Sequence, residues 1–169
     1  MKLQKIDKVR YRKHFNVVMV AFIASFLILA VLLGQLFISL FSAPGADNFW
    51  FNLSGVAVAF LIVLTLVNRF KNHLFMTEVL YVWEMKKQIN YIHRKLAKVK
   101  KLAFDEKNVD AIIILTFYYQ ACGQLYHLDD NTITVSSLNA EKQKLEDLIA
   151  KYNLTINIDL YEQALIKSI

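Results

Sequence analysis

The 169-residue chain contains one cysteine, one proline and four glycines. Its single cysteine, Cys122, cannot form an internal disulfide, so we expect the C-terminal part of the chain to lie in a reducing compartment. The scattered glycines form no phosphate-binding loop, and neither HExxH nor GxSxG occurs. No cysteine and histidine spacing is typical of a zinc or haem site. We therefore predict no enzyme activity, no metal and no cofactor.

Charged residues are missing from two long stretches near the N-terminus. The first runs from Phe15 to about Phe41, the second runs from Phe49 to Val67, and a short turn at residues 42–48 joins them. Each stretch has the roughly 20 apolar residues that a helix needs to cross a hydrocarbon core of about 30 Å. The sequence therefore predicts two membrane-spanning helices joined as a hairpin.

This pattern divides the chain into three predicted parts. Residues 1–14 form a basic N-terminus, residues 15–68 form the transmembrane hairpin with spans at about 17–41 and 49–67, and residues 69–169 form a cytoplasmic helical domain.

The placement of positive charge predicts the orientation of the hairpin. The first fourteen residues contain six lysines and arginines against Asp7 alone, and Arg69 and Lys71 follow the second stretch. The turn at residues 42–48 has neither lysine nor arginine. Because Lys and Arg in short loops stay on the cytoplasmic side, we expect both termini to be cytoplasmic.

Small residues recur four apart in both apolar stretches. Ala30 and Gly34 form one pair, and Gly55 and Ala59 form the other, each about ten residues from the turn. Small residues permit the close backbone approach on which helix association in lipid depends. They either pack the hairpin itself or contact another membrane subunit. The interiors of the spans have no Asp, Glu, Lys, Arg or His, so a transport path is not favoured.

Residues 74–104 lack glycine and proline and predict one long helix. Its apolar residues alternate by three and four, as in a helix that packs against another helix. We call the following six residues the tail seam: Val82, Met85, Ile89, Ile92, Leu96 and Val99. The partner is either the next helix of the same chain or the same helix in a second copy.

The same helix is strongly basic. Its positively charged residues, here called the basic set, are Lys86, Lys87, Arg94, Lys95, Lys98, Lys100 and Lys101. The set is interpreted as a solvated face, as a contact for anionic lipid or an acidic protein, or as a contact for nucleic acid or the ribosome. Apart from Tyr91, no aromatic residue is interleaved for base stacking, so nucleic acid is the least favoured of these.

The rest of the chain predicts a mainly helical domain. Polar residues 105–108 suit a helix N-cap, and Val109 to Leu128 form an apolar helix that is interrupted by polar residues before it reaches bilayer length. We interpret this helix as the core of the domain. A further helix is expected from Leu138 to about Lys151, and alternating residues at 132–135 and 154–160 predict at most a minor two-strand β ribbon.

Two polar groups are weighed as functional sites. His127, Asp129 and Asp130 lie together, but no further ligands follow at a recognisable spacing, so a polar loop is the preferred interpretation. Cys122 and His127 are five residues apart on a helix and point in different directions, so a nucleophile and base pair is not predicted.

Three stretches carry a family resemblance. They are Ile6 to His14 before the first span, Phe75 to Glu84 after the second, and Gln124 to Thr134. Together they resemble a family of small two-span inner-membrane proteins of Gram-negative bacteria, a domain of unknown function. The resemblance covers essentially the whole chain and implies the topology and the location. It implies no functional residues.

Taken together, the sequence predicts a non-enzymatic, membrane-anchored interaction or accessory subunit of an inner-membrane assembly. Its expected partners are membrane lipids and either another membrane protein or further copies of itself. The alternative hypothesis is a membrane tether that docks a ribosome, nucleic acid or anionic lipid through residues 84–101. Salt would separate the two, because phosphate contacts weaken steeply as salt rises.

Overall fold

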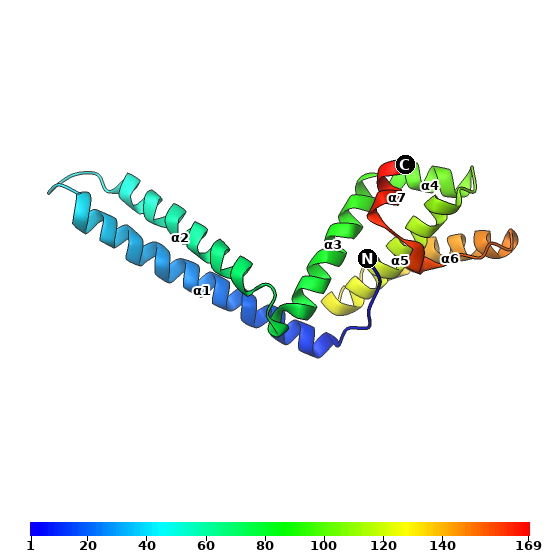
Figure 1. Cartoon of the computed structure of the whole chain (residues 1–169), viewed down its shortest axis with the longest axis horizontal. Coiled ribbons are helices and arrows are strands. Elements are labelled where there is room, and N and C mark those ends of the chain that lie inside the picture. The colour runs from blue at the N-terminus through cyan, green and yellow to red at the C-terminus, as the bar shows by residue number, and fades with distance from the viewer. The chain divides into compact units, whose positions relative to one another are not determined.

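The computed structural model describes residues 1–169, and all its regular elements are helical (Figure 1). In chain order they are α1 (Lys8–Phe41), α2 (Phe49–Phe70), the 3-10 helix η1 (Leu74–Met76), α3 (Thr77–Arg94), α4 (Leu96–Phe104), α5 (Val109–Asp129), α6 (Val135–Lys151), the 3-10 helix η2 (Ile158–Leu160) and α7 (Gln163–Ser168). The prediction of a mainly helical fold is confirmed.

The chain divides into two compact units. The hairpin unit comprises Val9–Leu80, and the tail unit comprises Met1–Lys8 together with Tyr81–Ile169. The border between them falls inside α3, so η1 and the first turn of α3 group with the hairpin.

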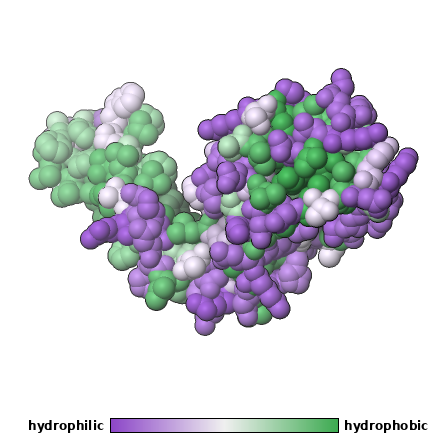
Figure 2. Space-filling model, turned by 45° about the vertical axis from the view of Figure 1, so that its right-hand side comes forward, coloured by the Kyte–Doolittle hydropathy of each residue, from purple (hydrophilic) through white to green (hydrophobic).

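In the hairpin unit, α1 and α2 are long enough and apolar enough to cross a membrane. At 1.5 Å per residue, their 34 and 22 residues extend for about 50 Å and about 33 Å. A core helix of a soluble protein would be mostly buried, whereas only 6% and 17% of their most apolar 18-residue segments are buried here. Figure 2 shows this unit as an almost continuous hydrophobic surface.

The backbones of the two long helices are in contact at two glycines. A Cβ atom added to Gly55 would lie 2.5 Å from the backbone nitrogen of Gly34 and 2.7 Å from its Cα. Ala59 and Val63 continue the contact along α2 and are 0% and 2% exposed. The backbones therefore touch near the turn at residues 42–48, where no larger side chain fits.

In the tail unit, α5 is the central helix. Eleven of its 21 residues are buried, and they face all sides of the helix rather than one stripe. Helix α4, helix α6, η2 and α7 all pack against it. The Asn108 side chain caps its N-terminus by accepting a hydrogen bond from the Ala111 amide at 3.0 Å. The predicted core helix and its cap agree with this structure.

The C-terminal segment closes one side of this core. The ring of Tyr161 stacks on Phe117 with centroids 3.7 Å apart, and its hydroxyl donates to Gln88 Oε1 at 2.9 Å. Tyr161 is 1% exposed and Gln88 is 4% exposed, and burial raises the pKa of the tyrosine. This hydrogen bond ties α3 to the segment before α7.

The predicted single helix over residues 74–104 is instead interrupted. Residues 74–76 form the 3-10 helix η1, and Lys95 separates α3 from α4 with φ −112° and ψ 10°. The Lys95 amide bonds three residues back to Ile92, and its ammonium donates to the carbonyl of Ile166 at 2.8 Å. Because no glycine or proline marks this position, the break is a tertiary effect in which packing of α4 on α5 overrides helix propensity.

The strands expected at residues 132–135 and 154–160 are not formed. Asn131 Oδ1 accepts from the Ile133 amide at 3.2 Å, and Asn157 Oδ1 accepts from the Asp159 amide at 2.9 Å. Such side-chain to backbone bonds satisfy the local backbone as turns and compete with a strand ladder. Helix α6 accordingly begins at Val135, three residues before the predicted start.

We predict that Gly55→Val separates the two long helices. The added side chain would overlap the Gly34 backbone, which cannot rotate away, and overpacking of this kind costs about 1–3 kcal/mol. Thermal stability of the purified chain in mild detergent measures the loss. Ala57→Val, on the exposed face of α2, is the matched control, and an equal effect of both substitutions would refute the close contact.

We predict that Tyr161→Ala destabilises the tail unit by about 3–5 kcal/mol, because it removes a buried aromatic side chain. Tyr161→Phe should cost about 1–3 kcal/mol, since Gln88 loses a buried hydrogen-bond partner. Urea titration of the full chain in detergent gives the free energy of unfolding. Tyr91→Ala, at a residue 37% exposed, should change it little. Similar values for the two alanine variants would contradict the described core.

Candidate functional site

A polar cluster lies at the end of the hairpin unit remote from the turn. Glu78, which is 9% exposed, accepts from Arg10 Nε at 2.8 Å, and its second oxygen lies 3.2 Å from His14 Nδ1. The ring of His14 also stacks on Phe75 with centroids 3.9 Å apart. These contacts fix the start of α3 against α1. Lys13 lies next to His14 in α1, and Arg69 and Lys71 lie where α2 ends, so we call this end of α1 and α2 the basic end of the hairpin.

Of the four small residues predicted to pack in the membrane, Gly34, Gly55 and Ala59 lie in or beside the contact between α1 and α2. Gly34 and Gly55 are in backbone contact, and Ala59 is fully buried. Ala30 is half-buried. A side chain added at Gly34 would meet Asn52 Oδ1 at 2.9 Å, so a polar side chain also borders the contact. The structure thus uses these residues within the hairpin itself.

The tail seam is largely covered by the chain's own residues. Val82, Met85, Ile92 and Val99 are at most 1% exposed. Ile89 and Leu96 are half-buried. Gln88 is not part of the three-and-four spacing of the tail seam, yet it is only 4% exposed. Its buried side chain is paired, because it accepts the hydrogen bond from Tyr161. Of the two partners considered for the seam, this structure shows contacts within one chain.

Five of the seven residues in the basic set have partners inside the tail unit. Lys86 pairs with Asp129 at 3.0 Å and Lys87 with Glu84 at 2.8 Å. The other three contacts are Lys95 with the Ile166 carbonyl, Lys98 with the Ile169 backbone oxygen, and Lys100 with Glu141. Arg94 and Lys101 are exposed. The set is therefore a partly neutralised face, not a uniform row of free charge.

Glu141, the partner of Lys100, has a strongly shifted pKa. Hydrogen bonds from Lys100 and then Lys144 lower its pKa to about 2. Lys100 comes from α4 and Glu141 from α6, so the pair links two helices that both pack on α5.

The polar residues weighed as catalytic or metal-binding sites are used structurally. Asp129 pairs with Lys86, and Asp130 pairs with Lys8 of the N-terminal segment. Asp130 also has φ 55°, the left-handed conformation that ends α5. Cys122 is 3% exposed, and burial raises the pKa of its thiol to about 11.

Sequence reasoning missed the role of the first eight residues. The Gln4 amide donates to the Tyr81 hydroxyl at 2.8 Å, that hydroxyl donates to Gln124 Oε1 at 3.1 Å, and Gln124 Nε2 donates to the Gln4 carbonyl at 2.6 Å. Lys2 also pairs with Asp159 at 3.7 Å. The N-terminal segment is therefore part of the tail unit. No periodicity signals these contacts, since they join isolated polar residues more than 40 positions apart.

The family comparison covers nearly the whole of this helical architecture. A family model described as "Protein of unknown function (DUF3087)" matches residues 1–166. The chain belongs to the DUF3087 family. No curated protein and no solved structure matches this DUF3087 chain. The match includes the N-terminal segment, both long helices and the tail, so these parts form one family unit.

We predict that Glu141 contributes to acid stability. A carboxylate whose pKa is lowered from 4.5 to about 2 stabilises the fold above pH 4.5, and this contribution is lost as the pH falls through 2. Glu141→Gln should therefore flatten the pH dependence of unfolding between these limits, as followed by urea titration in detergent. The control is Glu146→Gln. Glu146 pairs with Lys142 at 3.5 Å, and its side chain is 51% exposed. An unchanged pH profile for Glu141→Gln would refute the assignment.

Proposed function

We propose that this chain is an integral inner-membrane protein of Gram-negative bacteria that acts as a non-enzymatic interaction or accessory subunit of a larger membrane assembly. In this proposal α1 and α2 span the bilayer, and both termini lie in the cytoplasm. The tail unit is a folded cytoplasmic body carried by the hairpin.

The observation that carries the proposal is the uncovered apolar surface of the hairpin unit. Contact between α1 and α2 uses a narrow strip around Gly34, Gly55 and Ala59. The large side chains on the other faces stay 36% to 79% exposed. A soluble monomer rarely exposes a contiguous apolar patch above a few hundred Å², so this surface supports a location in lipid or against the spans of a partner.

Charge placement supports the orientation. Arg10, Lys13, Arg69 and Lys71 gather at one end of the hairpin, while the opposite turn carries Asp47 as its charged residue. Positive residues next to span ends are retained on the cytoplasmic side. Glu78 pairs with Arg10, so this end remains net positive.

We predict that the tagged full chain, extracted from its native membrane in mild detergent, co-purifies with a stoichiometric membrane protein that survives a high-salt wash. Apolar contacts between spans do not weaken with salt, whereas a complex held by 6–10 phosphate contacts loses about 10³–10⁵ in affinity between 50 and 200 mM salt. Size-exclusion chromatography, mass spectrometry and absorbance at 260 nm identify what remains bound.

A matched pair of variants tests the alternative tether. Arg94→Glu with Lys101→Glu reverses the two exposed charges of the basic set for which no ion pair is described above, and Lys167→Glu reverses one exposed charge on α7. An accessory subunit keeps its partner in both variants. Ribosomal proteins or RNA that are lost in high salt and in the double variant alone would establish the tether. Recovery of the chain alone would refute both functions.

A further inference from the structure

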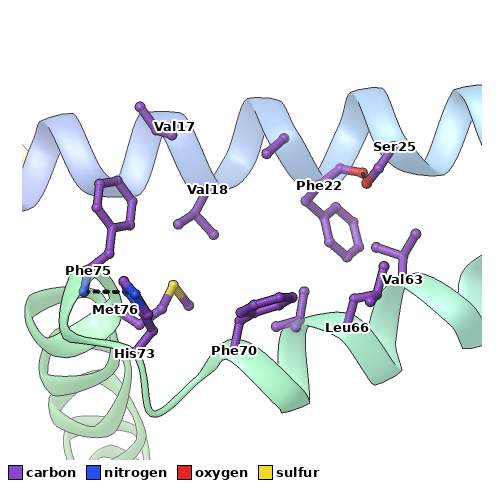
Figure 3. A pocket seen from close by; sticks show the side chains of 12 residues that line it. Val17, Val18, Phe22, Ser25, Val63, Leu66, Phe70, His73, Phe75 and Met76 are labelled. Atoms are coloured by element: carbon purple, nitrogen blue, oxygen red, sulfur yellow. Dashed lines mark hydrogen bonds between the residues drawn. The ribbon is translucent and has the colours of Figure 1, made fainter.

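An apolar groove lies between α1 and α2, on the side of the hairpin unit away from the turn. It has a volume of about 540 Å³, within the roughly 300–1,000 Å³ typical of ligand sites. Figure 3 shows side chains from both helices and from η1 pointing into it. Its walls include Val18, Phe22, Val63, Leu66, Phe70 and Met76.

The groove follows from how the helices pack. Near the turn the backbones touch at Gly34 and Gly55. Farther along, Phe26 and Phe60 meet edge to face with centroids 6.3 Å apart, and Phe22 and Phe70 then line the space between the helices. Residues of η1 stand at the end of the groove where α2 stops (Figure 3). The hairpin is thus closed near its turn and hollow near its basic end.

The lining offers an occupant almost no hydrogen bonds. Ten of the twelve lining residues are apolar, and the other two are Ser25 and His73. Ser25 Oγ donates to the Phe22 carbonyl at 3.1 Å, and His73 Nδ1 accepts from the Phe75 amide at 3.2 Å. A ligand with polar groups along its length would leave them unpaired, which is costly in an apolar site. The groove therefore suits a hydrocarbon chain.

The dimensions and the openings suit one acyl chain. The lining residues of α1 run from Val17 to Ser25, which corresponds to about 12 Å along the helix. Val17, Leu66 and Phe70 are 50%, 44% and 58% exposed, so the groove opens sideways along the hairpin. A lipid chain can enter from the surrounding bilayer while its headgroup stays at the interface.

Three basic residues are close in sequence to residues that line the groove. Arg69 and Lys71 flank the lining residue Phe70, and Lys13 precedes Val17 by one helical turn. All three side chains are exposed, and the nearby acid Glu78 is held by Arg10 and His14. Basic pockets between membrane helices on the cytoplasmic side are typical of sites for anionic headgroups.

We propose that this groove holds one acyl chain of an anionic phospholipid, whose headgroup is bound by Lys13, Arg69 and Lys71. The proposal rests on the membrane insertion given under the proposed function. A spanning helix of a second copy is a poorer occupant, because η1 stands at the basic end of the groove and the positive charge there would repel an identical basic end.

The test is native mass spectrometry of the full chain released from nanodiscs that contain equal amounts of phosphatidylglycerol and phosphatidylcholine. The wild-type chain should retain one phosphatidylglycerol. Ala21→Trp, which fills the groove, should abolish retention, whereas Val20→Trp, at a residue 67% exposed on the same helix, should not. Arg69→Gln with Lys71→Gln should reduce the preference for phosphatidylglycerol by about thirtyfold.

A second measurement uses only the wild-type chain and so does not depend on the folding of a variant. Phosphatidylglycerol with a photoactivatable diazirine in mid-chain should label peptides containing Phe22, Leu66 or Met76 more than peptides containing Val31 or Leu32, which face outward.

Several outcomes would overturn the proposal. These are equal lipid retention in Ala21→Trp and Val20→Trp, equal retention of both lipids by the wild type, uniform labelling, or a lipid-free dimer that fills the groove itself. In each of these cases the chain is still membrane-inserted, so the proposed function is not contradicted and is decided by the co-purification experiment. A chain that does not enter nanodiscs would overturn the proposed function as well.

Discussion

Two long apolar helices with almost no cover from their own chain expose a surface that is unfavourable in water. Within the hairpin unit the backbones of α1 and α2 touch at Gly34 and Gly55. This contact joins α1 to α2 but uses few of their side chains. Every larger residue on the remaining faces then needs an apolar environment, which a bilayer supplies. The proposed location, the orientation and the lipid groove all depend on this requirement.

The tail unit differs from the hairpin unit because its large apolar residues are mostly buried within the chain. Helix α5 is buried on all sides because α4, α6 and the C-terminal segment pack around it. Polar contacts such as Tyr161 with Gln88, and Lys100 with Glu141, then fix which segments pack on it. These contacts also use much of the basic set, so the exposed charge of α3 and α4 is smaller than the sequence suggests.

The sequence predicts features that depend on long runs and periodic spacing. The two apolar helices, the core helix at residues 109–129 and the burial of Val82, Met85, Ile92 and Val99 follow from such patterns. It fails where single tertiary contacts decide the outcome. The break at Lys95, the turns in place of strands at Asn131 and Asn157, and the docking of residues 1–8 have no periodic signal. The groove has no signal in the sequence either, because it is lined by side chains from α1, α2 and η1 that only the folded chain brings together.

The most direct test of the account is the sidedness of the hairpin. Single cysteines would be placed in a Cys122→Ser background at Ala46 in the turn, at Lys5 and at Ser168, all exposed positions. An impermeant maleimide should label the turn position in intact spheroplasts and the other two only in inverted vesicles. Labelling of all three from one side, or release of the chain by alkaline carbonate, would contradict a two-span membrane protein with both termini in the cytoplasm.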